Sequence, residues 1–208
     1  NFLIEERGIF WASIIITGRT SHAGEPDKGS NSIVKASKLI QILNTKYKKE
    51  LKKRNVGMHK STISIGIIKG GENINVVPYK TEILIDRRIT SKENIKKSFA
   101  HMKNFIKKHE PNVKISFLTG TNSFSSNLNN SYLKSLKNSY KLVKGKNPIF
   151  LSSIGVSDGR YFADYNINII NVGPGDGDEG HRSNEKLLNS DIVEYYLLLS
   201  NFLNKLVN

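Results

Sequence analysis

Residues 61–88 read STISIGIIKGGENINVVPYKTEILIDRR, two apolar stretches on either side of a turn-rich connection. Apolar and polar residues alternate in 61–69 and again in 81–88, as they do in strands that bury one face. The connection, 70–79, is rich in glycine and asparagine and carries a proline, residues that favour turns. The stretch therefore predicts two antiparallel strands that are neighbours in one sheet.

The sequence on either side of this pair predicts two more strands and two helices. The β-branched run IFWASIIIT at 9–17 indicates a buried strand, and 113–118 (VKISFL) indicates a fourth. From Asn31 onward apolar residues recur at helical spacing. Residues 90–93 have the spacing of a capping box, and the helix that follows stops before Pro111. The predicted order is β-α-β-β-α-β, a ferredoxin-like domain whose two helices cover one face of a four-stranded antiparallel sheet.

The rest of the chain predicts an incomplete second domain. After Gly120 comes a polar, turn-rich linker, and a helix is expected at 131–143. A short strand at 149–152 and a short helix around 157–163 should follow. The nearly continuous apolar run at 167–172 is typical of a parallel strand covered on both faces. A terminal helix is then expected from Asn189. Two such strands cannot bury each other, so their neighbours must come from elsewhere.

Composition excludes several classes of protein. The chain has 208 residues, 38% of them hydrophobic, which is enough for a core. No apolar run approaches the roughly 20 residues of a membrane span, and no signal peptide precedes the first strand. We therefore expect a cytoplasmic protein with no membrane partner. Without cysteine, any metal must be held by histidines and carboxylates. The first residue is not Met and the chain opens directly into an apolar stretch, which indicates a piece of something longer.

The formal net charge of +14 raises the possibility of a polyanionic partner. Most of the basic residues are lysines spread over every helical segment, which favours a solvated basic surface. The predicted sheet also lacks a compact aromatic set for base stacking, because Trp11 and Phe117 are isolated. We expect no nucleic-acid partner, and salt-dependent RNA binding would reverse that view.

Three motifs could carry chemistry. His181 lies in the glycine-rich loop GPGDGDEGHRSNE (173–185), and His22 lies in GRTSHAGEP (18–26). Taken alone, each is more often a surface residue than a ligand or catalyst. The turn GVSDGR (155–160) could hold an anion at a helix N-terminus with help from Arg160, or it could simply cap a helix through Ser157 or Asp158. From the residues alone, both readings of the turn stay open.

Four blocks in order change this picture. They are ERGIFWASIIITGRTSHAGEPDKGSNSI (6–33), GGENINVVPYKTEILIDRR (70–88), GVSDGRYF (155–162) and GPGDGDEGHRSNE (173–185). Together they resemble the aminoacylase-type co-catalytic zinc metallopeptidase family, which includes acetylornithine deacetylase, succinyl-diaminopimelate desuccinylase and carboxypeptidase G types. The resemblance implies an α/β chain in three parts: 1–12 leading in from a catalytic domain, 13–120 as a lid and dimerisation domain, and 121–208 as the C-terminal part of the catalytic domain.

The resemblance also implies roles for individual residues. The position of His22 reaches across a homodimer and stabilises the oxyanion in the partner's active site, a role with a clear electrostatic rationale. By the same resemblance Asn75 contacts substrate and Arg88 binds the substrate carboxylate. Ser157 and Arg160 would hold the acyl or carboxylate end, and His181 would be a zinc ligand.

The departures from the family pattern limit what this chain can do. No histidine is followed by Asp two residues later. The pair Glu5–Glu6 matches the segment that enters the lid, downstream of the family's carboxylate ligands, so no glutamate pair is present to serve as ligand and base. One metal ligand is then present where an open zinc site needs about three. We expect the chain alone neither to bind a zinc pair tightly nor to hydrolyse amides.

The complete protein is expected to hold two zinc ions per site, with cobalt or manganese as possible substitutes. It would act as a homodimer formed through the lid and cleave the amide of an N-acyl amino acid or small peptide, as a deacetylase or desuccinylase. The main alternative is a non-catalytic dimerisation or binding module derived from such an enzyme.

Overall fold

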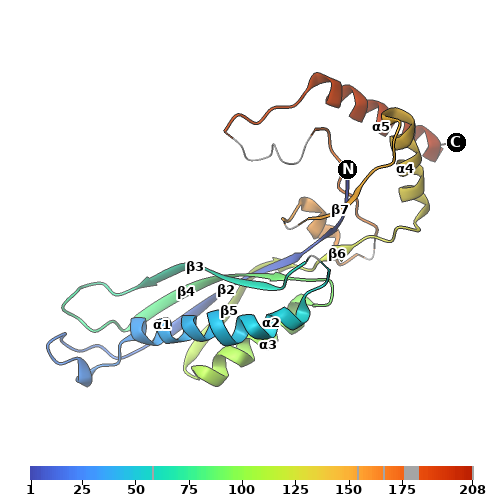
Figure 1. The fold of residues 1–208 in the computed structure, drawn as a ribbon. Helices are drawn as coiled ribbons and strands as arrows, with labels where there is room; N and C mark the ends of the chain where they lie inside the picture. The colour runs from blue at the N-terminus through green and yellow to red at the C-terminus, as the bar shows by residue number, and fades with distance from the viewer. Residues whose placement is uncertain (58, 154, 166, 176–182, 208) are drawn as a thin grey trace. The chain divides into compact units, whose positions relative to one another are not determined.

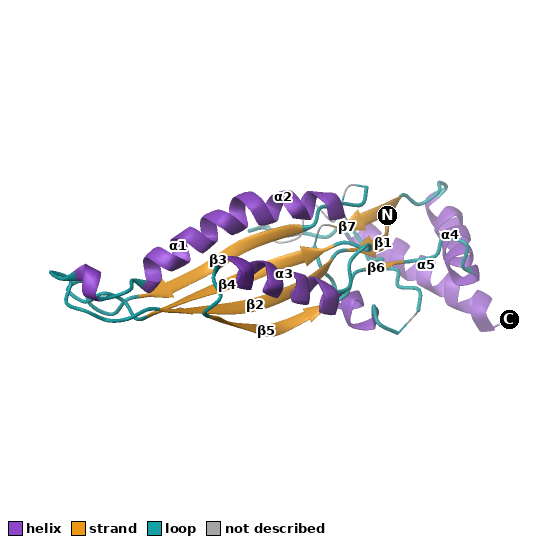
Figure 2. Cartoon of the chain, turned by 90° about the horizontal axis from the view of Figure 1, so that it is seen from below, coloured by secondary structure: helices purple, strands orange, loops and turns teal. Residues whose placement is uncertain are grey.

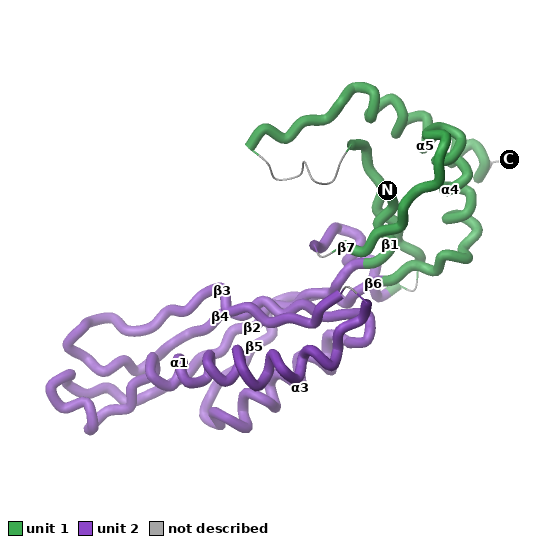
Figure 3. The backbone as a smooth tube through the Cα atoms, viewed as in Figure 1, with its two compact units in different colours: residues 1–5, 125–153, 165–208 green, residues 6–124, 154–164 purple. Residues whose placement is uncertain are grey.

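This computed structural model describes residues 1–57, 59–153, 155–165, 167–175 and 183–207. The chain forms two compact units, coloured separately in Figure 3. We call Glu6–Phe124 with Ile154–Asp164 the sheet unit. We call Asn1–Glu5, Ser125–Ser153 and Tyr165–Asn208 the terminal unit. The division of the sequence at residues 12 and 120 stays a prediction.

The sheet unit is built on a four-stranded antiparallel sheet in the order β3-β4-β2-β5 (Figure 1). The strands are β2 (Gly8–Thr17), β3 (Thr62–Gly70), β4 (Lys80–Ile89) and β5 (Val113–Thr121). In the central pair Gly8 lies opposite Ile89, and Thr17 lies opposite Lys80. This register puts the start of β2 beside the end of β4.

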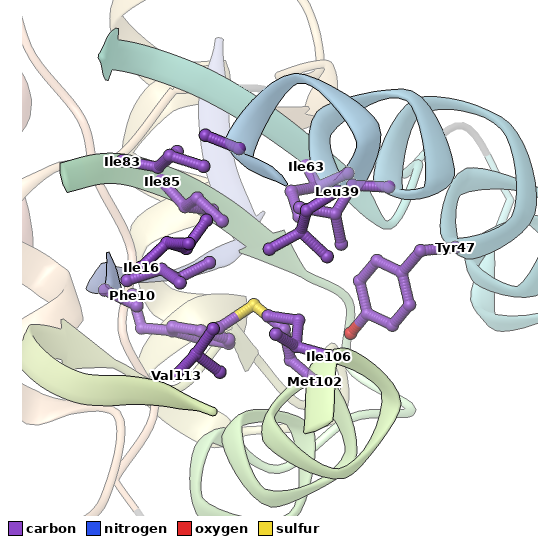
Figure 4. Close-up of a cluster of buried hydrophobic side chains, with 14 of the residues drawn as sticks. Phe10, Ile16, Leu39, Tyr47, Ile63, Ile83, Ile85, Met102, Ile106 and Val113 are labelled. Carbon is purple, nitrogen blue, oxygen red and sulfur yellow. The ribbon is translucent and has the colours of Figure 1, made fainter. Parts of the chain in front are cut away.

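The α-helices of the sheet unit lie against one face of this sheet (Figures 1 and 2). They are α1 (Ser32–Ile42), which continues through the π-helical turn Leu43–Tyr47 into α2 (Lys48–Leu51), and α3 (Ile95–His109). The alternating residues that face the helices make the core shown in Figure 4, where Ile16 and Ile83 from the strands meet Leu39 and Met102 from the helices. The other face of the sheet carries none of these α-helices, and Arg160 and Tyr161 of a 3-10 helix in the same unit line a pocket there with Ile9 and Trp11.

The predicted β-α-β-β-α-β order is therefore confirmed. The capping box predicted at 90–93 forms in part, since the Thr90 amide donates to the Glu93 carboxylate at 3.0 Å, but it does not cap helix α3. Helix α3 begins at Ile95. The side chain of Asn94 caps it by accepting hydrogen bonds from the backbone amides of Lys96 and Lys97. Glu93 is drawn inward because the guanidinium of Arg87 is completely buried and needs a charged partner, 2.6 Å away.

The terminal unit has a smaller sheet in the order β6-β1-β7. Its strands are β1 (Phe2–Glu6), β6 (Phe124–Ser125) and β7 (Phe150–Ser153). Two helices of this unit, α4 (Ser131–Lys144) and α5 (Asn189–Val207), pack against each other. Its buried cluster is Phe2, Leu133, Leu136, Tyr140 and Leu198. The helices expected at 131–143 and from Asn189 are confirmed.

Two predictions for the second half need correction. Residues 167–172 do not form a strand, and among the described residues their ladder contact is an antiparallel bridge between Asn171 and Leu3. The reason is local: the amide of Ile169 donates to the Ser126 hydroxyl at 2.9 Å, so a side chain takes the place of a neighbouring strand. The helix expected around 157–163 is a 3-10 helix, η4 (Asp158–Phe162).

Candidate functional site

His22 and Asn75 lie side by side at one end of the sheet unit. His22 is in the loop after β2, and Asn75 is in the loop between β3 and β4. The backbones of the two loops are bonded: the amide of Ala23 donates to the carbonyl of Asn75, and that of Val77 donates to Ser21, both at 2.9 Å. Both candidate side chains are exposed. The structure thus brings these two predicted residues together from separate segments.

The ring of His22 has a defined hydrogen-bonding state. The backbone amide of Gly24 donates to its Nδ1 at 3.1 Å, so this nitrogen acts as an acceptor. A neutral imidazole has one acceptor and one donor nitrogen, and the proton must therefore sit on Nε2. His22 presents Nε2–H as a donor on an exposed side chain. That is the group needed to stabilise a negatively charged oxygen.

Glycine at position 18 lets the loop that carries His22 lie close to Ser30 and to the start of β4. Its amide donates to the carbonyl of Tyr79 at 2.6 Å, which joins the loop to the start of β4. A Cβ at Gly18 would lie 1.8 Å from the carbonyl oxygen of Ser30, closer than any side chain can come. The sequence could reveal only that a glycine ends the strand there.

Arg88 lies near the other end of β4, on the face of the sheet opposite the α-helices. Its guanidinium forms a two-point ion pair with Asp86, with Nε–Oδ1 at 2.8 Å and Nη2–Oδ2 at 3.2 Å. Burial, and after it the positive charge of Arg88, lower the pKa of Arg7, while Asp86 raises it, so Arg7 shares this region. Sequence reasoning missed Asp86, although its place two residues before Arg88 on a strand puts both on one face.

Ser157 and Arg160 belong to the same sheet unit. The Ser157 hydroxyl accepts from the amide of Gly159 at 3.1 Å and caps η4, so the capping reading is observed. The Ser157 amide donates to Glu6 at 2.9 Å. Arg160 stacks on Tyr161, with the guanidinium carbon 4.8 Å from the ring centre, and donates to its hydroxyl.

Arg160 also lines a shallow pocket of about 240 Å³ on the sheet unit. Its walls include Ile9, Trp11, Thr119 and Tyr161. Because Ile9 and Trp11 lie near the start of β2, the pocket is at the Arg88 end of the sheet.

The candidate residues therefore fall into two groups at opposite ends of the sheet unit. Lys80, where the Asn75 loop joins β4, and Arg88 are eight residues apart on that strand, about 27 Å at about 3.4 Å per residue. His22 and Asn75 are at one end, and Arg88 and Arg160 are at the other. His181 lies outside the described residues. Among the residues that are described, no group of three His, Asp or Glu side chains could hold a metal ion.

The sequence profile of the peptidase dimerisation domain, M20_dimer, matches residues 4–114, more than half of the chain. The chain belongs to this family. Within the described residues of this peptidase dimerisation domain protein, no helix is long and apolar enough to cross a membrane.

The similarity to known proteins extends beyond the matched residues 4–114. Succinyl-diaminopimelate desuccinylase from Hahella chejuensis is 25% identical over 203 residues, covering 97% of this chain and 51% of the relative. The enzyme of the same name from Helicobacter hepaticus is 27% identical over 205 residues, covering 96% and 50%. The chain spans about half the length of these relatives. The predicted family resemblance is confirmed.

Solved structures show the same fold. Aminopeptidase PepT from Bacillus cereus superposes with a TM-score of 0.77 at 21% identity, covering all of this chain and 54% of PepT. The M20 metallo-carboxypeptidase Sso-CP2 from Sulfolobus solfataricus gives 0.75 at 14% identity, covering 98% and 59%. The mixed α/β fold class with two sheets is that of M20 metallopeptidases.

Proposed function

We propose that this peptidase dimerisation domain protein works in a metal-dependent amidohydrolase that cleaves the amide of an N-acyl amino acid or small peptide. In this proposal His22 donates a hydrogen bond to the oxyanion in the active site of a second copy of the chain. The observation that carries it is the separation of His22 and Asn75 from Arg88 and Arg160.

The separation is too large for one small substrate. An extended N-acyl amino acid is about 10 Å long, at about 3.5 Å per residue length. A site that used Arg88 could not use His22 of the same chain, because the two lie near opposite ends of β4. Two copies related by a twofold axis would solve this, since each would contribute one end to the other's site.

The chemistry suited to each group follows from its atoms. Attack on an amide carbonyl places negative charge on the carbonyl oxygen, and a donor aimed at that oxygen stabilises the transition state more than the substrate. Nε2–H of His22 is such a donor, and the Asn75 amide is a neighbouring polar group. The guanidiniums of Arg88 and Arg160 suit the carboxylates of substrate and acyl group. The described residues do not fit a zinc pair, so the metal ligands and the base must be supplied by other residues.

The edge strand β3 supports a homodimer formed through the domain. It is the outer strand of the sheet, and Ile67 and Ile68 on it are 43% and 47% exposed. Val34 on the neighbouring helix α1 is also 47% exposed. An exposed apolar edge strand can pair with the same strand of another copy.

A subunit-mixing experiment tests the proposal. His22→Ala and His181→Ala are made separately in the full-length protein that contains this chain, and activity is assayed with N-acetylornithine and N-succinyl-diaminopimelate. Each variant alone should lose about 100-fold or more of kcat. After the two are unfolded together and refolded, random pairing in a twofold dimer should restore about a quarter of wild-type activity, because half the dimers then hold one intact site.

Recovery of no activity on mixing, with dimers present, would contradict a role for His22 in the partner's site.

A second candidate, a non-catalytic dimerisation module, is favoured by the absence of a metal-ligand cluster among the described residues. It predicts a stable dimer with no turnover of either substrate in wild type.

A further inference from the structure

We propose that Trp11 and Asp86 are positioning residues that hold the guanidinium of Arg88 in the orientation in which it takes a carboxylate of the substrate. The inference rests on the proposed role of Arg88 and adds two residues to it.

The three side chains form a chain of hydrogen bonds across two strands. Trp11 on β2 lies directly opposite Asp86 on β4. The indole Nε1–H of Trp11 donates to Oδ2 of Asp86 at 3.0 Å. Arg88 donates to both oxygens of the same carboxylate. Asp86 therefore accepts three hydrogen bonds from two side chains, and its own rotation is restricted.

The pairing leaves a particular edge of Arg88 available. Asp86 takes the side edge of the guanidinium, formed by Nε and Nη2. The end edge, formed by Nη1 and the second hydrogen of Nη2, then points away from Asp86, because the group is planar and rigid. This end edge can bind another carboxylate at two points. Fixing it before substrate arrives removes the entropy cost of ordering a long side chain.

Arg7 shares the electrostatic environment of this pair, since its charge interacts with those of both Arg88 and Asp86. The Arg88 and Asp86 side chains are 25% and 29% exposed, so their interactions are screened less than those of a fully exposed pair.

Trp11 has a second property that a purely structural residue does not need. It is 49% exposed, and it lines the same pocket as Arg160. One indole therefore anchors Asp86 through its N–H and forms a wall beside the second candidate arginine. From the sequence, Trp11 was considered only for base stacking; its pairing with Asp86, 75 positions away, appears only in the folded sheet.

The test compares two substrates in the full-length protein: an N-acyl amino acid and its α-amide, which lacks the carboxylate. The variants are Trp11→Phe, which removes the N–H, Asp86→Asn, which removes the charge, and Arg88→Gln. The quantity measured is the KM of the acid divided by that of the amide. Trp11→Phe and Asp86→Asn should raise this ratio about fivefold to tenfold, and Arg88→Gln should raise it most.

A matched control exists on the same two strands. Ser13 on β2 donates to Glu82 on β4 at 2.7 Å, a similar bond between the same strands. Ser13→Ala and Glu82→Gln should leave the ratio within about twofold. A purely structural role for Trp11 and Asp86 would change both substrates equally and leave the ratio unchanged.

A second measurement needs no activity. The ¹⁵Nε–¹H signal of Arg88, assigned by its loss in Arg88→Gln, should exchange with water several-fold faster in Asp86→Asn and in Trp11→Phe. Unchanged exchange in both variants overturns the inference, whatever the kinetics show.

If Arg88→Gln leaves the acid-to-amide ratio unchanged, the proposed role of Arg88 fails, and the positioning role with it. If only Arg88→Gln changes the ratio, the role of Arg88 stands and the inference fails.

Discussion

The backbone amide of Gly24 donates the hydrogen bond that holds the His22 ring. A Cβ added at Gly24 would lie 3.1 Å from Nδ1 and 3.5 Å from Cε1 of the ring, so the imidazole would have to move. We expect Gly24→Ala to lower kcat of the full-length enzyme about tenfold with KM within about twofold, since the lost interaction belongs to the transition state. Steady-state kinetics measure this.

The control for Gly24→Ala is Lys28→Ala in the same loop. Lys28 pairs with Glu25 on the surface, and their side chains are 71% and 59% exposed. Its removal should leave kcat unchanged. Equal losses in the two variants would indicate damage to the whole loop and not displacement of His22.

At the scale of elements, a buried ion pair ties β4 to the start of α3. The Arg87 and Glu93 side chains are 0% and 2% exposed, and Glu93 also accepts from the Ser61 hydroxyl just before β3, at 2.7 Å. Glu93→Gln leaves a buried guanidinium without a counter-charge. It should lower the free energy of unfolding by about 3–5 kcal/mol, measured by urea titration.

The exposed pair of Glu25 with Lys28 provides the comparison for that change. Glu25→Ala should alter the unfolding free energy by less than about 1 kcal/mol, because solvent screens exposed pairs. A similar loss in the two variants would mean that burial of the Arg87–Glu93 pair is not what makes it important.

The same elements show what a sequence can reveal. Strands β3 and β4 were predictable because alternation is a local signal that needs no knowledge of the partner strand. The role of Glu93 was not, because its spacing from Thr90 imitates a capping box, and only the tertiary fold shows the buried Arg87. The register that sets Trp11 opposite Asp86 is likewise a property of the assembled sheet.

Some residues of the candidate site could likewise be predicted from the sequence, and others could not. The capping role of Ser157 was one of the two readings that its turn alone predicts, and the structure shows it. His22 and Asn75 would have passed as ordinary loop residues without the family resemblance, because the bonds between their loops link segments about 50 positions apart. Their roles, with those of Arg88 and Arg160, stay predictions until the variants are measured.

At the scale of the whole molecule, the proposed dimer should depend on the β3 edge. Ile68→Lys places a charge where a second strand would pair, and the dissociation constant should rise at least about tenfold. Sedimentation at several concentrations measures it. Leu118→Lys on the opposite edge strand, β5, is the control, since Leu118 is 51% exposed. Loss of the dimer through Leu118 and not Ile68 would assign the interface to the other edge.

The π-helical turn Leu43–Tyr47 keeps a long helix in phase with the sheet beneath it. The buried residues Leu39, Leu43, Tyr47 and Leu51 follow one another at intervals of four. In a regular α-helix four residues advance about 400°, so such a row drifts about 40° per step around the axis. A π-helical turn advances less per residue and returns the row to the core. The wider turn therefore accommodates about one extra residue: deleting one residue within it should restore a regular α-helix and leave Leu51 facing the core.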